Sequence, residues 1–253
     1  MPYQLVLVSP LLAPVWIAGL VRLFRDPAVR RVRFVAVAYV VLLAVFLVTG
    51  GKPYYLAGLY PVLLAAGAEP TLAWSRRTVT RRRLVGCAIG LSAVIDAPLM
   101  LPLVPMATLH ATPIVAVNYD AGETVGWPRF AATLAGARDA LPRPDRARAV
   151  VLTGNYGEAA AVDRYGPALG LPRAYSGHNA YGEWGPPPER PGPVLAVGVP
   201  RPLLHRLFAS VRPVARIDNG VDVDNDEQGA TVWLCSGRRE TWRAAWPLIR
   251  HLS

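Results

Sequence analysis

Residues 34–51 read FVAVAYVVLLAVFLVTGG and contain no charged side chain. About 20 consecutive apolar residues cross the hydrocarbon core of a bilayer as a helix. Three further stretches have this character, namely residues 4–21, residues 53–74 with Glu69 as their one charge, and residues 84–106 with Asp96 as theirs. The sequence therefore predicts a membrane α-helical region of about four spans. The alternative is a very apolar soluble helical bundle.

The basic charge of the chain belongs to its apolar half. The chain has a net charge of +10, of which residues 1–106 carry +8 and residues 107–253 carry +2. Arginine next to long apolar runs is typical of membrane proteins with basic cytoplasmic loops. No RNA- or DNA-binding motif accompanies the charge, which argues against nucleic acid as a partner. We therefore expect a transmembrane region over 1–106 and a separate domain over 107–253.

The charges between the spans predict their orientation. Residues 22–33 and residues 75–83 each contain five arginines, whereas Lys52 is the only cation between the second and third spans. The positive-inside rule places the two arginine-rich loops in the cytoplasm. Lys52, the N-terminus and the domain over 107–253 are then extracytoplasmic, in a multi-pass protein of the plasma membrane surrounded by its lipids. Because an external N-terminus without a signal peptide is unusual, we expect a truncated chain or gene fragment.

Residues 107–253 have the pattern of a soluble α/β domain. Short apolar runs predict strands, and helical spacing or a proline start predicts the helices between them. The predicted strands are 149–153, 173–176, 194–199, 211–217 and 230–235, and the predicted helices are 157–169 and 202–210. Alternating strands and helices favour a layered, largely parallel sheet. Residues 182–193, rich in proline and glycine, are expected to form a long loop.

The acidic segment 218–229, DNGVDVDNDEQG, invites comparison with a calcium-binding loop. An EF-hand loop needs glycine at its sixth position and glutamate at its twelfth, between two helices. This segment has neither the spacing nor the flanking helices, so a solvated hairpin is the better interpretation. The two cysteines, Cys87 and Cys235, lie on either side of the predicted membrane boundary, and we expect no disulfide, metal site or cofactor.

Residues 50–61, GGKPYYLAGLYP, hold the most distinctive local feature. Lys52, the only lysine of the chain, stands at the predicted outer end of a span, ahead of Tyr54, Tyr55 and Tyr60. An ammonium group at this depth can hold a phosphate, and aromatic rings can cover a sugar or an isoprenoid chain. Lysine and tyrosine also serve as interfacial anchors, and composition alone favours that role.

The two predicted intramembrane acids have separate interpretations. Asp96 is either a functional group within the membrane or part of a helix break beside Pro98. Glu69 is expected near the cytoplasmic end of its span, in an ion pair with Arg76 or Arg77.

Two polar segments follow predicted strands of the outer domain. TGNYGEA, residues 153–159, offers Asn155, Tyr156 and Glu158, and SGHNAYGEWG, residues 176–185, offers His178 and Asn179. Ligands of open α/β sheets bind at the carboxyl edge of the strands, and this combination of polar and aromatic side chains suits a carbohydrate. Roles in packing these loops are equally open. No nucleophile elbow of the G-x-S-x-G type is present around Ser176.

Four segments of the chain together resemble a known family. They are GGKPYYLAGLYPVLLAAGA and, later in the sequence, NYGEAAAVDRYG, GLP and SGHNAYGEWGP. These segments are similar to actinobacterial dolichyl-phosphate-mannose protein mannosyltransferase-like enzymes (glycosyltransferase family 39), relatives of the aminoarabinose transferase that modifies lipid A. The resemblance covers nearly the whole chain, but only the C-terminal half of such an enzyme.

The resemblance implies a GT-C fold and transfer of a sugar from a polyprenyl-phosphate donor to an extracytoplasmic acceptor. Lys52 and the tyrosines would face the donor's phosphate and sugar. The family's catalytic acid lies in an early outer loop that has no counterpart here. The resemblance therefore implies a chain inactive alone, with no catalytic residue of its own and a separate N-terminal half as partner. The alternative is a membrane-anchored extracytoplasmic module that binds a carbohydrate or partner without catalysis, and a weaker one is a transporter or scaffold subunit.

Overall fold

The computed structural model describes residues 8–252. The chain divides into two compact units, one ending at Leu103 and one beginning at Val104. This division falls three residues before the boundary that composition predicts. Each unit has its own hydrophobic core, and each is described by itself.

The first unit is entirely helical over its described residues. Its elements are η1 (Pro10–Leu12), α2 (Ala13–Arg25), η2 (Pro27–Val32), α3 (Arg33–Thr49), η3 (Pro53–Leu59), α4 (Tyr60–Ser75) and α5 (Val79–Met100). The helix boundaries have local causes. Gly50 ends α3 in the left-handed conformation that glycine adopts without strain, and the Thr78 side chain caps the first turn of α5.

Three helical stretches of the described residues are long and apolar enough to cross a membrane. They are Pro27–Thr49, Tyr54–Ser75 and Val79–Met100. Helix α5 has 22 residues and is about 33 Å long at 1.5 Å per residue, close to the thickness of the hydrocarbon core. The predicted first span, 4–21, lies partly outside the described residues. Its described part continues into α2, whose 13 residues are fewer than the number needed for a span, so that span stays a prediction.

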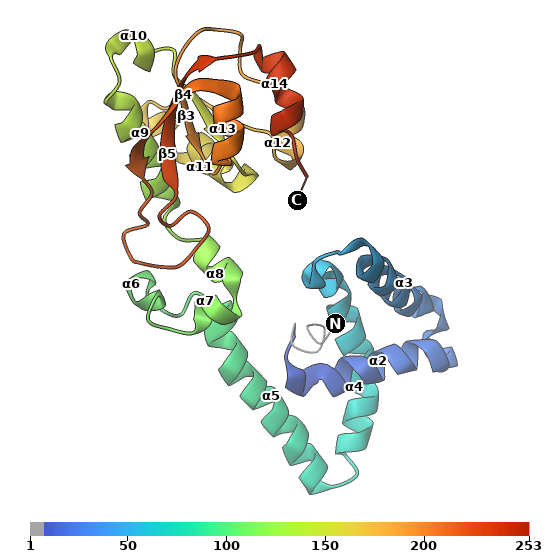
Figure 1. Ribbon diagram of the computed structural model, residues 1–253. Helices are drawn as coiled ribbons and strands as arrows, with labels where there is room; N and C mark the ends of the chain where they lie inside the picture. Colours follow the sequence, from blue (N-terminus) through green and yellow to red (C-terminus); the bar gives the residue numbers. More distant parts are fainter. Residues whose placement is uncertain (1–7, 253) are drawn as a thin grey trace. The chain divides into compact units, whose positions relative to one another are not determined.

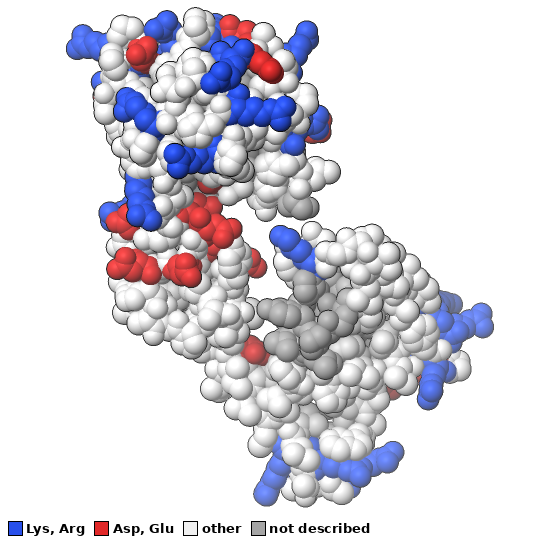
Figure 2. Space-filling view, in the orientation of Figure 1, with Lys and Arg blue, Asp and Glu red and all other residues white. Residues whose placement is uncertain are grey.

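The apolar side chains of α3 and α5 point outward to a degree that is unusual for a soluble protein. Phe34, Val48 and Val94 are among many large apolar residues exposed on these two helices, and Val94 is 71% exposed. Helix α5 buries only Ser92. In Figure 2 the surface of these helices is largely white, and the blue side chains stand at its margins. An exposed apolar surface of this extent is typical of a region that contacts a membrane or another protein.

Helices α2 and α4 cross at two glycines, and Figure 1 shows the crossing. A Cβ on Gly19 would overlap the Leu63 carbonyl oxygen, and one on Gly67 would overlap the Val15 carbonyl oxygen. Small residues that let two helix backbones touch are typical of helix packing in membranes. Glu69, on α4, forms its ion pair with Arg22 of α2. The expected pair with Arg76 or Arg77 is wrong, because the crossing brings Arg22 to Glu69.

The second unit contains short helices and one sheet (Figure 1). Its helices are α6 (Met106–Leu109), α7 (Ile114–Val117), α8 (Tyr119–Glu123), α9 (Trp127–Asp139), α10 (Arg143–Arg146), α11 (Tyr156–Tyr165), η4 (Pro167–Leu169), α12 (Asn179–Glu183), α13 (Arg201–Leu207) and α14 (Trp242–Ile249). Its strands are β1 (Val150–Thr153), β2 (Ala174–Ser176), β3 (Val194–Val197), β4 (Phe208–Arg216) and β5 (Thr231–Arg238). Each of the five predicted strands is present.

The sheet has the order β2-β1-β3-β5-β4 and is mixed. Strands β1, β2 and β3 are parallel, whereas β5 pairs antiparallel with both β3 and β4. The expectation of a largely parallel sheet is therefore only half right. Helix α11 connects β1 to β2, and α12 lies between β2 and β3, as connections between parallel strands require. Strands β4 and β5 are joined by the loop 217–230 without a helix, and such a connection gives an antiparallel pair. One core includes residues of α9 and α11, and the other includes residues of α13 and α14.

Candidate functional site

The segment around Lys52 joins α3 to α4 through η3. Lys52 is exposed, and its Nζ lies 5.9 Å from the centre of the Tyr54 ring. The rings of Tyr54 and Tyr55 meet edge to face at 5.3 Å, and both are half exposed. The quadrupole of an aromatic ring attracts an ammonium group that lies near the face of the ring. The segment thus presents one cation and two accessible rings together.

Tyr60 differs from the other tyrosines of this segment. It is 1% exposed and packs with Trp16 and Tyr39, at ring distances of 5.5 and 6.1 Å. Tyr60 therefore holds α2, α3 and α4 together, which gives it a packing role. Its predicted contact with a substrate has no support in its position.

In the second unit, the predicted polar residues follow the carboxyl ends of β1 and β2. These strands end at Thr153 and Ser176, and β3 ends beside them at Val197. Because the three strands are parallel, the segments that follow them lie at one edge of the sheet. Each of these segments begins with a glycine, namely Gly154, Gly177 and Gly198. A Cβ on any of them would overlap a backbone or carboxylate atom.

Asn155 starts helix α11 as a capping box. Its side-chain oxygen accepts a hydrogen bond from the Glu158 backbone N–H at 2.8 Å, and the Glu158 carboxylate accepts one from the Asn155 backbone N–H at 3.1 Å. This reciprocal pair satisfies amide groups that the first helical turn leaves free. The Asn155 amide also donates to Glu227, in the loop between β4 and β5, at 3.3 Å.

The Glu158 carboxylate lies deep in the protein, with 2% of the residue exposed. It accepts a second hydrogen bond from the Gly154 N–H at 2.8 Å. Burial raises its pKa to about 7, although the two backbone donors oppose the rise. A Cβ on Gly198 would overlap this carboxylate, so the glycine makes room for it. Glu158 therefore builds the turn and has little access to a ligand.

Glu227 forms a second buried carboxyl group at this edge, with 5% of the residue exposed. Burial raises its pKa to about 7, and the carboxylates of Glu123 and Glu158 add to the rise. Glu123 also accepts a hydrogen bond from the backbone N–H of Asp226. Figure 2 shows the resulting gathering of acids over α8 and the loop between β4 and β5. The expected solvated hairpin is thus only partly right, because this loop buries Glu227 with two asparagines, Asn219 and Asn225.

His178 is packed among rings. It lies 4.9 Å from Tyr156 and stacks on His251 at 4.6 Å with an angle of 11° between the planes. The Tyr156 backbone N–H donates to His178 Nδ1 at 3.4 Å. Asn179 has a φ of 49°, a left-handed conformation that asparagine tolerates, and its N–H donates to the His251 carbonyl oxygen. These contacts attach the C-terminal segment to the edge of the sheet.

A pocket of about 310 Å³ opens beside these residues. Its wall combines Thr153, Gly154 and Gly198 at the strand ends with His251 and apolar side chains of α13 and α14. None of the five predicted outer-domain residues lines it. Asn155, Glu158, His178 and Asn179 make contacts that shape the turns around it, whereas Tyr156 is exposed. Their direct contact with a ligand stays a prediction.

Sequence reasoning missed His251 and Glu227. His251 lies outside every predicted strand and helix, and only its pairing with residues 177–179 brings it to the sheet edge. Glu227 belongs to a segment whose alternating acids suggest solvent exposure. The buried Glu227 carboxylate accepts a hydrogen bond from Asn155, which is 72 residues away in the chain. Within residues 8–252, no three histidine, cysteine or acidic side chains are grouped so as to hold a metal ion.

Comparison with known proteins gives the chain no relatives: no family model, no curated protein and no solved structure matches it.

Proposed function

We propose that the chain is part of a multi-pass membrane glycosyltransferase of the GT-C type, which moves a sugar from a polyprenyl-phosphate donor to an extracytoplasmic acceptor. The observation that carries the proposal is the Lys52 segment. It places one cation and two accessible tyrosine rings at the junction of two helices that are each long enough to span a membrane.

The proposed chemistry assigns this segment to the donor. As the acceptor oxygen bonds to the sugar's anomeric carbon, the bond from that carbon to the phosphate oxygen breaks and the polyprenyl phosphate leaves with the electron pair. The Lys52 ammonium stabilises the charge that develops on the phosphate. The rings of Tyr54 and Tyr55 offer apolar faces to the sugar or to the first isoprene units. The acceptor's proton passes to an ionised carboxylate that acts as the general base and is supplied from outside residues 8–252.

The proposed topology follows from the three candidate spans. Successive crossings place residues 22–33 and residues 75–83 on one side of the membrane and Lys52 on the other. Ten arginines then lie in the cytoplasm, as the positive-inside rule requires. Helix α5 brings the chain back to the side of Lys52, so the second unit is extracytoplasmic. The donor's phosphate and the second unit then share one face of the membrane.

The test is binding of the donor's lipid part. We expect the chain, reconstituted in lipid nanodiscs, to bind undecaprenyl phosphate and not undecaprenol, which lacks the phosphate. Lys52→Ala removes the cation and is expected to weaken binding by about tenfold, the equivalent of one charge-assisted contact. Lys52→Arg, which keeps the charge, should retain part of the affinity. Isothermal titration calorimetry measures all of these.

Arg31→Ala provides the matched control, since Arg31 is an exposed cation of η2, just before the end of α3 that lies opposite Lys52. Its removal should leave the affinity unchanged. Equal losses in the Lys52 and Arg31 variants would show a general attraction of the lipid to basic charge. Equal binding of undecaprenol and undecaprenyl phosphate would contradict the proposal and leave Lys52 as an interfacial anchor.

A further inference from the structure

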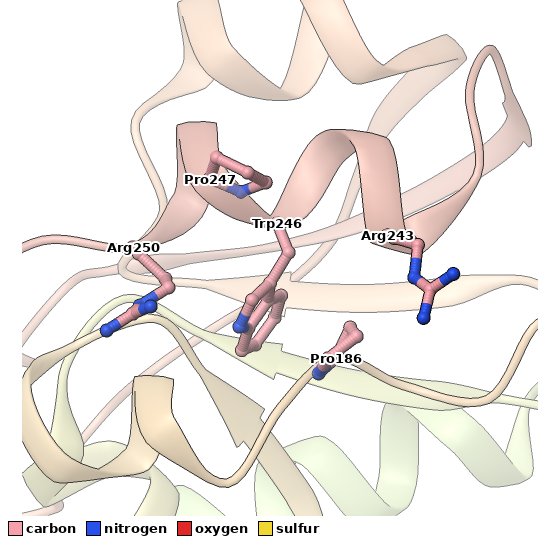
Figure 3. Close-up of a pocket in the computed structure, with 5 residues that line it drawn as sticks. All are labelled: Pro186, Arg243, Trp246, Pro247 and Arg250. Carbon is pink, nitrogen blue, oxygen red and sulfur yellow. The ribbon is translucent and has the colours of Figure 1, made fainter.

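A second pocket of the second unit lies between α14 and the proline-rich loop 182–193. It has a volume of about 460 Å³ and is lined by Pro186, Arg243, Trp246, Pro247 and Arg250. Figure 3 shows Arg243 and Arg250 toward opposite ends of α14, with the Trp246 ring between them and Pro186 on the facing loop. The volume lies in the range of small-molecule sites, about 300–1,000 Å³.

The two arginines of this pocket differ in their ion pairing. Arg250 is paired with Glu183. Among the described residues, Arg243 has no carboxylate partner for its guanidinium group. The nearby Glu189 carboxylate accepts a hydrogen bond from the Arg243 backbone N–H and is ion-paired with Arg238 instead. The pocket therefore keeps one positive charge that the protein does not neutralise.

The middle of the pocket is apolar. Trp246 is 6% exposed, and its indole N–H donates to the Gly182 carbonyl oxygen at 3.0 Å, so its polar group is already satisfied. What the indole offers to the pocket is a strip of ring carbon, and Pro186 and Pro247 add two further carbon surfaces. The pocket thus has an apolar floor with a guanidinium group on either side.

We propose that this pocket binds a sugar that carries a phosphate or a carboxylate. The anionic group pairs with Arg243, in the bidentate geometry that guanidinium groups offer to phosphate and carboxylate oxygens. The C–H face of the sugar ring lies on Trp246, Pro186 and Pro247. Arg250, held by Glu183, donates to ring or hydroxyl oxygens. A purely apolar ligand leaves both guanidinium groups unused, and inorganic phosphate leaves the apolar floor empty.

The pocket is formed only by residues of the second unit and shares none with the proposed donor site. A failure at Lys52 leaves this pocket untouched, and a failure here leaves the donor site untouched.

The test is calorimetric titration of the full chain in nanodiscs with four probes. Glucose 6-phosphate and glucuronate are expected to bind, whereas methyl glucoside and inorganic phosphate should bind at least about tenfold more weakly, since each lacks one half of the recognition. Arg243→Gln should weaken binding of the two anionic sugars by about tenfold. Glu183→Gln should strengthen it by about twofold to fivefold, because it frees the Arg250 guanidinium for the ligand.

Arg206→Gln is the matched control, since Arg206 is an exposed arginine of α13 outside the pocket. It should leave all affinities unchanged. Circular dichroism at 220 nm confirms that each variant keeps its secondary structure. The proposal is overturned if inorganic phosphate binds as tightly as glucose 6-phosphate, if Arg243→Gln behaves as Arg206→Gln does, or if neither anionic sugar binds.

Discussion

Helix α5 and the sheet of the second unit use the same kinds of side chain in opposite ways. Val94 on α5 is 71% exposed, whereas Val151 and Val197 in the sheet are fully buried. In the second unit, the strands place their apolar residues under helices on both faces of the sheet. Helix α5 has no such cover within the described residues. This difference is expected if the first unit contacts lipid and the second contacts water, and it can be tested region by region.

The largest expected effect comes from placing a charge on α5. Leu91 is exposed near the middle of this helix, and Leu91→Arg would cost about 3 kcal/mol if that face contacts lipid, the usual price for arginine at a helix centre. Cys87, one turn away and exposed on the same helix, reports the change. In intact membranes we expect Cys87 to resist a water-soluble maleimide in the wild type and to react in the variant, as mass spectrometry can measure.

Leu169→Arg is the counterpart in the second unit, where Leu169 is also exposed. If its surroundings are water, this substitution should change neither stability nor labelling at Cys87. A wild-type Cys87 that reacts in membranes as fast as a free thiol would break the comparison, since α5 would then face water.

The next effect concerns packing within the first unit. Gly67→Leu places a side chain where α2 and α4 touch, and overpacking of this kind costs about 1–3 kcal/mol. The midpoint of thermal unfolding in detergent, followed by tryptophan fluorescence, should fall. Gly86→Leu on α5 is the control, because no atom lies within 4 Å of a Cβ built there. Equal midpoints for the two variants would mean that the glycine contact contributes nothing to the unit.

The smallest effect is a pH dependence in the second unit. The folded pKa of Glu227 is about 7, above its ordinary value of 4.5, so the folded state holds the proton more tightly than the unfolded state. The contribution of Glu227 to stability is therefore largest below pH 4.5, falls as pH rises toward 7 and is constant above it. Glu227→Gln cannot ionise, and it should raise stability at pH 8 by roughly 1 kcal/mol while changing little at pH 4.

The unfolding midpoint of the second unit, measured by near-ultraviolet circular dichroism between pH 4 and 8, reports this difference. Part of the dependence remains in the variant, because the Glu158 pKa is also raised to about 7. Asp222→Asn, an exposed substitution in the same loop, should leave the profile as in the wild type. A Glu227→Gln profile identical to the wild type would show that the Glu227 carboxyl group does not control the slope.

Much of the fold was accessible to sequence reasoning because it depends on local pattern. The apolar runs predicted the positions of α3, α4 and α5, and short apolar runs predicted every strand of the sheet. Helix α9 was not foreseen, since its alanine-rich sequence has only a weak apolar stripe. The antiparallel pairing of β5 with β3 is not predicted, because it depends on which distant strands meet and is not encoded in either strand alone.

The candidate sites were less accessible for the same reason. The capping box of Asn155 and Glu158 has a recognisable spacing, but the sequence signal does not distinguish a helix cap from a ligand contact. The burial of Glu227 and the stacking of His251 depend on contacts between residues far apart in the chain. The pocket around Trp246 lies between α14 and a loop about 60 residues earlier in the sequence, and no local sequence pattern predicts it.

The solitary lysine gives the chain an unusual chemical simplicity. All other basic side chains are arginine or histidine, so Lys52 and the N-terminal amine are the only primary amines. An acylating reagent that cannot pass a bilayer therefore has a single internal target. Applied to sealed cells or to inverted vesicles, it would mark one known position from one side only. Residue 52 is thus a built-in label for the sidedness of the whole chain, and no residue needs to be introduced to use it.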